Sequence, residues 1–285
     1  MPSIGHDAPR SEAVIFLASL AFQVESSGSL SPAEIEALQS LADSAPPTKP
    51  SGGRPFRILL EPGEPVREAV PAAARISWSE GLCLLEHAAF RAEIDPFRTE
   101  ARVFRGDTTA LGLITTLRTA LACLLPLEGG LVLHAAGLEH ARAGIAFFGP
   151  SGAGKSTLAA RSPWAVLSDE LVAVIADEPV AFRIRGTPFR KAPAGSQPSA
   201  IEQPPLRALV ELGKGPAFNL TRLERTEALR RLIGSAAVPA APPVWSAALR
   251  TMGDLVRDVP CYRMECSLEE SPFEPLATAL GLEPL

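Results

Sequence analysis

A glycine-rich segment in the middle of the chain has the pattern of a phosphate-binding loop. It follows the apolar run 144–148 and keeps the spacing Gly-x-x-x-x-Gly-Lys-Ser from Gly149 to Ser156. Because glycine lacks a Cβ, successive backbone N–H groups can turn inward and surround phosphate oxygens. The residues expected to contact a nucleotide are Gly149, Pro150, Ser151, Gly152, Ala153, Gly154, Lys155, Ser156 and Thr157. The pattern predicts that the protein binds a nucleoside triphosphate.

Two side chains at the end of this loop have the chemistry that phosphoryl transfer requires. Lys155 opens the helix that we expect after the loop, and its ammonium group is placed to reach the β- and γ-phosphates. The hydroxyl of Ser156 is placed to ligate Mg²⁺. We therefore expect the nucleoside triphosphate to be bound together with Mg²⁺.

Two carboxylates follow the short apolar strand that we expect at 164–168. A carboxylate at Asp169 or Glu170 can hold Mg²⁺, directly or through water, and can accept the proton of an attacking hydroxyl. Asp169 and Glu170 are therefore candidates both for contacting the metal and for accepting the proton. A solvated strand end is the alternative interpretation of the same pair.

His134 lies on an apolar stretch, 131–138, that we expect to be a strand. If this strand pairs antiparallel with the strand at 144–148, His134 comes to lie beside the phosphate loop. The position makes His134 a candidate catalytic residue, although a lone histidine on a strand is more often a satisfied core group.

A group of basic residues follows the carboxylates: Arg183, Arg185, Arg190 and Lys191. An arginine here can neutralise charge that develops on a transferred phosphoryl group. Alternation along a strand places Arg183 and Arg185 on the same face. We select Arg185 as the candidate.

Taken in order, the segments 133–135, 149–156, 167–170 and 185–186 resemble the HPr kinase/phosphorylase family, and in particular the HPr-kinase-related proteins found with modified-peptide biosynthesis systems. The resemblance covers about 130–266. It implies an α/β fold, with a mixed-sheet P-loop kinase core that is also related to ATP-dependent phosphoenolpyruvate carboxykinase. It further implies that His134, Lys155 and Asp169 form the active site, that Asp169 is the base towards a serine hydroxyl, and that Ser156 binds Mg²⁺.

The chain departs from the family pattern at two positions. Asp169-Glu170 stands where HPr kinases have two aspartates, and Arg183 stands where they have a glutamate that contacts Mg²⁺. The second metal contact would then fall to Glu170. The C-terminal phosphorylase region of the family has no convincing match, so we do not expect the reverse phosphorolysis reaction.

The remaining chain is expected to form an α+β extension before this core. Residues 1–50 are expected to hold two helices and a linker, with the first helix at 11–26. The second has Ser31 as its N-cap, Pro32 at its first helical position and Glu34 completing a capping box. Residues 51–128 are expected to hold an antiparallel meander of short strands and a helix at 109–126, and residues 129–285 the catalytic core. Thr109 opens that helix.

Composition limits the environment and the partners. Of 285 residues 46% are hydrophobic and 21% charged, and the net charge of −5 gives no reason to expect a nucleic acid or a membrane as partner. With no membrane-spanning run and no signal peptide, we expect a cytoplasmic location. Cys83, Cys123, Cys261 and Cys266 are expected to be buried free thiols, and His87 and His140 to be structural or solvated.

The sequence thus favours a kinase that transfers phosphate from ATP to a hydroxyl, most simply a serine of a peptide or protein. A small-molecule kinase and a nucleotide-gated peptide-binding module remain alternatives. The acceptor is left open because specificity resides in loops such as 186–205, which carry no motif. Related enzymes assemble, so a homo-oligomer is a further expectation from the resemblance.

Overall fold

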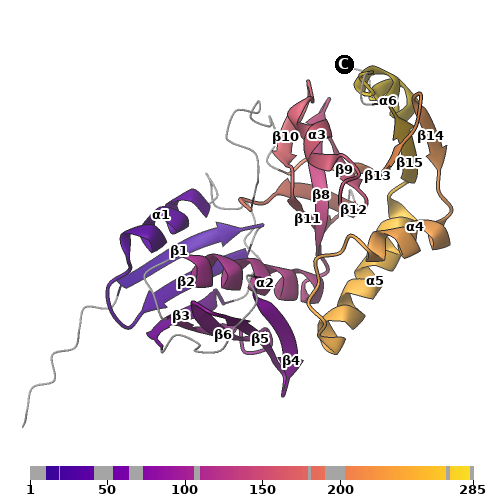
Figure 1. The fold of residues 1–285 in the computed structure, drawn as a ribbon. Helices are drawn as coiled ribbons and strands as arrows, with labels where there is room; N and C mark the ends of the chain where they lie inside the picture. The colour runs from indigo at the N-terminus through magenta and orange to yellow at the C-terminus, as the bar shows by residue number, and fades with distance from the viewer. Residues whose placement is uncertain are drawn as a thin grey trace, which may run out of the picture. The chain divides into compact units, whose positions relative to one another are not determined.

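The computed structural model describes residues 11–18, 20–41, 54–63, 73–105, 110–178, 181–189, 203–267 and 270–282. The chain divides into two units, which we call unit 1 (Met1–Leu124 with Pro239–Pro242) and unit 2 (Leu125–Val238 with Pro243–Leu285). Each is built on one mixed β-sheet with helices (Figure 1). The expected α/β class is therefore confirmed.

Unit 1 contains a seven-stranded sheet with strand order β1-β2-β3-β7-β6-β5-β4. Its elements are β1 (Ser11–Leu17), β2 (Leu20–Ser26), α1 (Pro32–Leu41), β3 (Phe56–Pro62), β4 (Arg75–Ser79), β5 (Leu82–His87), β6 (Phe90–Asp95), β7 (Glu100–Arg105) and the start of α2 (Leu111–Leu127). Helix α2 packs closely on the sheet, since a Cβ at Gly112 would lie 3.0 Å from Cβ of Phe90.

The helix expected at 11–26 is wrong, because this segment forms the antiparallel pair β1 and β2. Leu20, Phe22 and Val24 are buried and alternate with more exposed residues, which is the period of a strand. The turn between the strands includes Ala18, whose φ of 49° is left-handed. Apolar residues also occur on the more exposed face, such as Val14, which is 53% exposed, and together with the buried ones they mimic helical spacing.

The helix expected after Ser31 is confirmed together with its cap. The Ser31 backbone N–H donates to Oε2 of Glu34 over 2.8 Å, and the Glu34 N–H donates to Oγ of Ser31 over 3.3 Å. The Glu34 carboxylate, which is 1% exposed, also forms an ion pair with Arg105 at the end of β7. Residues 45–53 of the expected linker lie outside the described residues.

The meander expected at 56–104 is correct for β4 to β7, which pair antiparallel. It is wrong for β3, which pairs in parallel with both β2 and β7. Parallel neighbours need a crossover connection, and the segment between β2 and β3 that contains helix α1 supplies it. Strand β3 therefore lies between β2 and β7.

Unit 2 is an eight-stranded sheet with the order β12-β11-β8-β9-β13-β15-β14, in which β10 also pairs with β8. Its strands are β8 (Leu131–His140), β9 (Ala143–Phe148), β10 (Ala165–Ser168), β11 (Leu171–Asp177), β12 (Ala181–Gly186), β13 (Leu206–Lys214), β14 (Asn219–Arg222) and β15 (Cys261–Cys266). Its helices are α3 (Lys155–Ala160), α4 (Arg225–Ile233), α5 (Pro242–Asp258) and α6 (Phe273–Leu280). The three neighbouring strands β9, β13 and β15 run parallel.

Both faces of this sheet are covered, and alternation along β9 divides the side chains between them. Phe148 belongs to the core on the side of α4 and α5, which lie next to each other in Figure 1. Phe147 belongs to the opposite core, with Leu158 of α3 and with Phe273 and Leu276 of α6. The phosphate loop at the end of β9 is thus attached to a rigid layer.

The structure accounts for the isolated histidines and the cysteines. His87 stacks on Phe90 and His140 stacks on Trp164, as expected of structural residues. All four cysteines are free thiols; Cys266 is half-buried and the other three are buried. Among the described residues, no helix is both long and apolar enough to cross a membrane.

Candidate functional site

The phosphate loop lies between the end of β9 and the start of α3, as the sequence predicts. Three of its glycines have positive φ values: 145° at Gly149, 79° at Gly152 and 101° at Gly154. Residues with a Cβ rarely adopt such angles, so the backbone conformation itself explains why glycine occupies these positions. Backbone of this kind forms the anion-binding concavity that the motif predicts.

Lys155 curls back over the start of the loop. Its Nζ donates to the carbonyl oxygens of Gly149 over 2.8 Å and Pro150 over 3.1 Å, and the residue is only 6% exposed. The next two residues, Ser156 and Thr157, are exposed. The loop therefore holds its ammonium group close to the backbone nest and presents two hydroxyl groups outward.

His134 is brought to the beginning of the loop by the register of β8 and β9. These strands pair antiparallel with Ala135 opposite Phe148, so His134 is level with Gly149, the first loop residue. The His134 backbone N–H donates to the carbonyl oxygen of Ser235 over 2.7 Å, and its side chain is exposed. The expected antiparallel pairing is confirmed, and it sets the imidazole at the edge of the site.

Asp169 and Glu170 form a bend beside the same strand. Strands β10 and β11 pair with consecutive parts of one edge of β8, and the bend between them lies opposite Ala135, whose N–H donates to the Glu170 carbonyl oxygen over 3.1 Å. Strand β8 alone separates this bend from β9. Since neighbouring strands are about 4.8 Å apart, the two backbones lie roughly 10 Å apart.

The two carboxylates of the bend differ in exposure. Asp169 is 3% exposed, whereas Glu170 is half-buried. Ser168, just before them, is 1% exposed, and its hydroxyl has no hydrogen-bond partner among the described residues. Ser168 is not among the residues predicted from the sequence, because a serine at a strand end gives no sign there that it will be buried.

Arg185 and Gly186 at the end of β12 approach the same segment from the other side of β11. A Cβ at Gly186 would lie 2.1 Å from the carbonyl oxygen of Leu167, so β12 and β10 meet backbone to backbone. Arg185 is 4% exposed, and the Thr187 hydroxyl donates to the Leu171 carbonyl oxygen over 2.7 Å. The structure thus brings Arg185 into the region of Ser168 and Asp169.

Arg183 has a different role from Arg185. It forms an ion pair with Asp177 of β11 and donates to the Gln203 carbonyl oxygen over 2.9 Å. These contacts fix the Arg183 guanidinium at the β11–β12 hairpin and explain how the chain accommodates arginine at this position. The other two basic candidates, Arg190 and Lys191, lie outside the described residues.

The donor set is suited to a metal ion that arrives with a nucleotide. Within the described ranges, no three side chains of His, Cys, Asp or Glu gather to hold a metal by themselves. Mg²⁺ is typically held by one or two carboxylates, by water and by the phosphates of its substrate. Asp169, Glu170 and the exposed Ser156 hydroxyl fit such a partial set.

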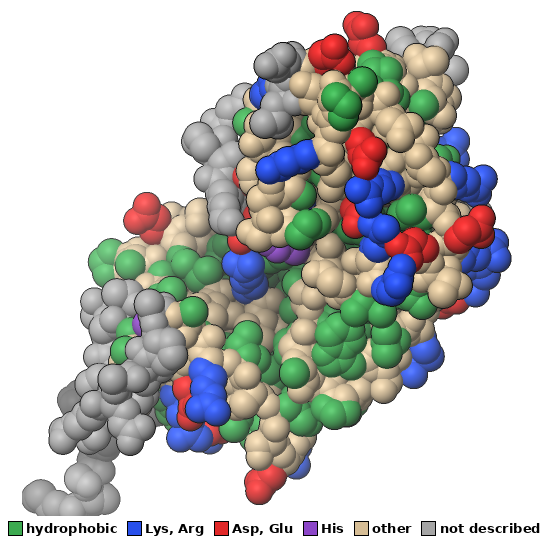
Figure 2. Space-filling view, turned by 45° about the vertical axis from the view of Figure 1, so that its right-hand side comes forward, with side chains coloured by type: hydrophobic (Ala, Val, Ile, Leu, Met, Phe, Trp, Pro, Cys, Tyr) green, Lys and Arg blue, Asp and Glu red, His purple; other side chains and the backbone are tan. Residues whose placement is uncertain are grey.

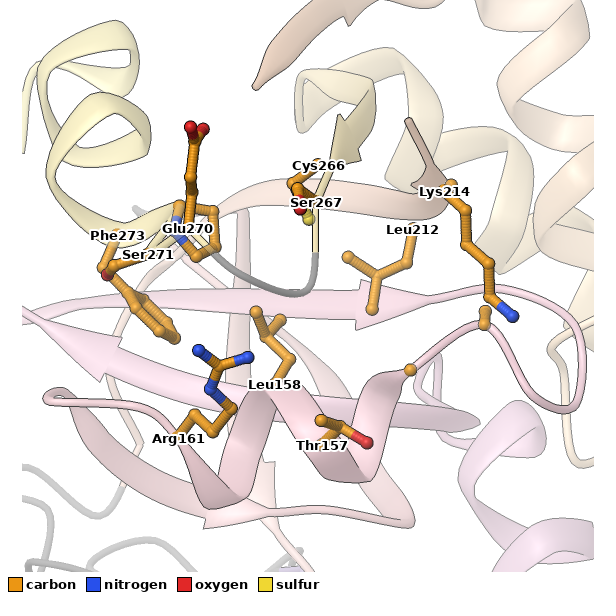
Figure 3. A pocket seen from close by; sticks show the side chains of 14 residues that line it. Thr157, Leu158, Arg161, Leu212, Lys214, Cys266, Ser267, Glu270, Ser271 and Phe273 are labelled. Carbon is orange, nitrogen blue, oxygen red and sulfur yellow. The ribbon is translucent and has the colours of Figure 1, made fainter. Parts of the chain in front are cut away.

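A cavity that the sequence did not predict lies on the other side of the loop, between α3 and helix α6 (Figure 3). Helix α6 was not expected, although Phe273, Leu276 and Leu280 have the spacing of an apolar helix face. The cavity has a volume of about 600 Å³, including the space where it opens to solvent.

Comparison with protein families shows which family the chain belongs to. The family model described as SynChlorMet cassette protein ScmC matches residues 106–280, which is more than half of the sequence. The protein belongs to the ScmC family. The matched range contains the phosphate loop, His134, Asp169 and Arg185. No curated protein matches the sequence.

The charged residues of this protein are distributed unevenly. On the face shown in Figure 2, basic and acidic side chains alternate, with no broad patch of one sign. Elsewhere in the same unit as the loop, Arg257 and Asp254 form an exposed ion pair. By contrast, Lys155, Asp169 and Arg185 are at most 6% exposed. Because burial of charge is unfavourable unless it is compensated, such groups mark a candidate functional site.

Proposed function

We propose that this protein is an ATP- and Mg²⁺-dependent kinase that transfers the γ-phosphoryl group to a hydroxyl, specifically to a serine of a peptide or protein. The observation that carries the proposal is the phosphate loop with its three left-handed glycines, set one strand away from the buried carboxylate of Asp169. A loop that binds triphosphate and a carboxylate within reach of its γ-phosphate are the two parts that such a reaction requires.

In the proposed reaction the acceptor oxygen forms a bond to the γ-phosphorus. The bond from that phosphorus to the β–γ bridging oxygen breaks, and ADP leaves with the electron pair. Asp169 takes the proton of the acceptor hydroxyl as general base. Lys155 and Arg185 lower the energy of the charge that spreads over the phosphoryl oxygens.

A bound Mg²⁺ would neutralise charge on the β- and γ-phosphates. Ser156, Asp169 and Glu170 are the residues proposed to hold it, with Glu170 taking the place of the glutamate that Arg183 replaces. The exposed ring of His134, level with Gly149, is proposed to orient the acceptor or the terminal phosphate at the edge of the site. The resemblance to HPr kinases supports these roles and a serine acceptor. It also supports the proposal that unit 2 has a kinase core of the HPr kinase type.

The proposal is tested by incubating the protein with Mg²⁺–ATP and serine-containing peptides encoded near its gene, followed by mass spectrometry. We expect one peptide to gain a single phosphate. Replacement Asp169→Asn should lower the rate by about 10²- to 10⁴-fold, the usual contribution of a general base, while ATP binding measured by calorimetry persists. The matched control is Asp177→Asn, which removes a carboxylate from the β11–β12 hairpin.

Three results would contradict this proposal in different ways. Phosphate transfer to a small molecule, but to none of the peptides, would make the protein a small-molecule kinase. ATP binding without transfer to either class, and without an effect of Asp169→Asn, would favour a nucleotide-gated binding module. Failure to bind ATP would overturn the nucleotide site itself.

A further inference from the structure

The cavity beside the phosphate loop combines apolar walls with direct access to the loop. Leu158 of α3, Leu212 of β13 and Phe273 of α6 line it, and Ala153, Gly154 and Thr157 form its border with the loop. Figure 3 shows Phe273 on one side, Lys214 on the other and the Thr157 hydroxyl below. Only about 90 Å³ of the cavity is free space between its walls, so a group held against Phe273 would extend through the open side towards the loop and solvent.

The aromatic wall of the cavity is held in place from behind. The Phe273 ring packs against Trp164 with the ring centroids 5.1 Å apart at an angle of 67°. Trp164 in turn stacks on His140, with the centroids 4.6 Å apart. A ring fixed by two further rings is a preorganised surface, so a planar group that binds against it has little ordering to impose on the protein.

The order of strands gives the site a direction. On one side of β9 lies β8 with the carboxylate bend, and on the other side lie β13 and β15, whose ends at Leu212, Lys214 and Cys266 line the cavity. Strands β9, β13 and β15 are parallel, and both the loop and the cavity lie at their carboxyl ends. Ligands of open α/β sheets bind at such ends.

From this arrangement we infer that the cavity binds the nucleoside part of the donor nucleotide, with the base against Leu158, Leu212 and Phe273. The triphosphate then runs along the loop, and its γ-phosphate points towards Asp169 on the opposite side. The inference rests on the proposed function, since it assigns the two ends of the same nucleotide. Thr157 and Lys214, at the border with the loop, are placed to contact the ribose and the α-phosphate.

Cys266 provides a direct probe of the cavity. It lines the cavity wall in Figure 3 and is half-buried, whereas the other three cysteines are buried. Burial raises the pKa of the Cys266 thiol, so its alkylation is slow but measurable at mildly alkaline pH. The probe needs no enzymatic activity.

The experiment measures the rate at which N-ethylmaleimide labels Cys266, by mass spectrometry, with ATP or with inorganic tripolyphosphate at saturation. ATP should slow the labelling by up to about 100-fold at a hundred times its Kd, when about 1% of sites are free. Tripolyphosphate, which has no nucleoside, should leave the rate unchanged although it binds the loop. Cys266→Ser is the control that identifies the labelled thiol.

The outcomes separate this inference from the proposed function. If calorimetry shows that ATP binds while Cys266 is labelled at an unchanged rate, the cavity is not the nucleoside site and the nucleotide site stands. Equal affinities for ATP and tripolyphosphate would likewise show that the cavity does not bind the nucleoside. If neither ligand binds, the proposed function fails and the inference fails with it.

A second variant tests the aromatic wall. Phe273→Leu should weaken ATP binding roughly two- to twelve-fold, the value of one aromatic contact, and leave tripolyphosphate binding unchanged. Unchanged tripolyphosphate binding also shows that the variant is folded. Thr278→Ala, on the exposed side of α6, is the matched control and should change neither affinity. Equal weakening of both ligands by Phe273→Leu would overturn the assignment.

Discussion

The two units of this protein differ in where their charged residues are concentrated. In unit 1 the sheet carries cross-strand ion pairs on a solvent-exposed face, such as Arg57 with Glu25, and Arg57 is 45% exposed. In unit 2 three charged residues are buried near the phosphate loop. Exposed pairs stabilise a sheet slightly and favour one register, whereas buried charges lower stability. The difference supports the proposal that unit 2 carries the chemistry.

The strongest test of this comparison removes one basic residue from each unit. Lys155→Met should lower the rate of phosphoryl transfer by about 10²- to 10³-fold, which corresponds to about 2.7–4 kcal/mol of transition-state stabilisation. Arg57→Met should leave the rate unchanged and alter the stability of unit 1 by about 0.2–1 kcal/mol, because its ion pairs are exposed. Rates come from single-turnover assays, and hydrogen exchange reports local stability.

Equal effects of the two replacements on transfer would contradict the comparison. The comparison would also be contradicted if the Lys155→Met variant lost activity because it unfolded. Hydrogen exchange of β9 distinguishes the second case, since exchange there should be as slow as in the unaltered protein.

One buried charge of unit 1 sharpens the comparison, because it is structural. Glu34 is 1% exposed, caps α1 and pairs with Arg105. Glu34→Ala leaves the cap unmade and the guanidinium without its partner, and should destabilise unit 1 by about 3 kcal/mol, the low end for a buried pair because Arg105 is partly exposed. Transfer by the protein that remains folded should be unchanged.

The control for this prediction is Glu36→Ala on the exposed side of the same helix, which should shift stability by less than about 0.5 kcal/mol. Segment-resolved hydrogen exchange of α1 and β3 measures both variants. Similar exchange in the two variants would show that the buried carboxylate of Glu34 contributes little.

The parts of the structure that the sequence predicts are those fixed by local chemistry. The loop from Gly149 to Ser156 needs particular backbone angles, and the cap at Ser31 needs particular side chains, so both could be located from residue types alone. The pairing of β8 with β9 followed from a short turn between two apolar runs. Local rules were sufficient in each case.

The parts that the sequence did not predict depend on distant neighbours. The segment 11–26 has apolar residues at both helical and strand spacing, and only pairing with β3 determines that it forms strands. The parallel insertion of β3 and the cavity against α6 likewise arise from elements far apart in the chain. The burial of Ser168 likewise depends on tertiary contacts.

The smallest predicted effect concerns the backbone that supports the site rather than its charges. Gly186→Ala places a methyl group 2.1 Å from the Leu167 carbonyl oxygen, and the adjustment should destabilise unit 2 by about 1–3 kcal/mol. A Cβ at Gly253, inside α5, would have no atom outside its own stretch of helix within 4 Å. Gly253→Ala should therefore stabilise the unit by about 0.5–1 kcal/mol. Urea unfolding followed by hydrogen exchange in β11 and α5 measures both changes. Leu167 directly precedes Ser168 and Asp169, so Gly186→Ala should also slow phosphoryl transfer, whereas Gly253→Ala should not. Equal transfer rates in the two variants would show that the contact between β10 and β12 does not position the carboxylate.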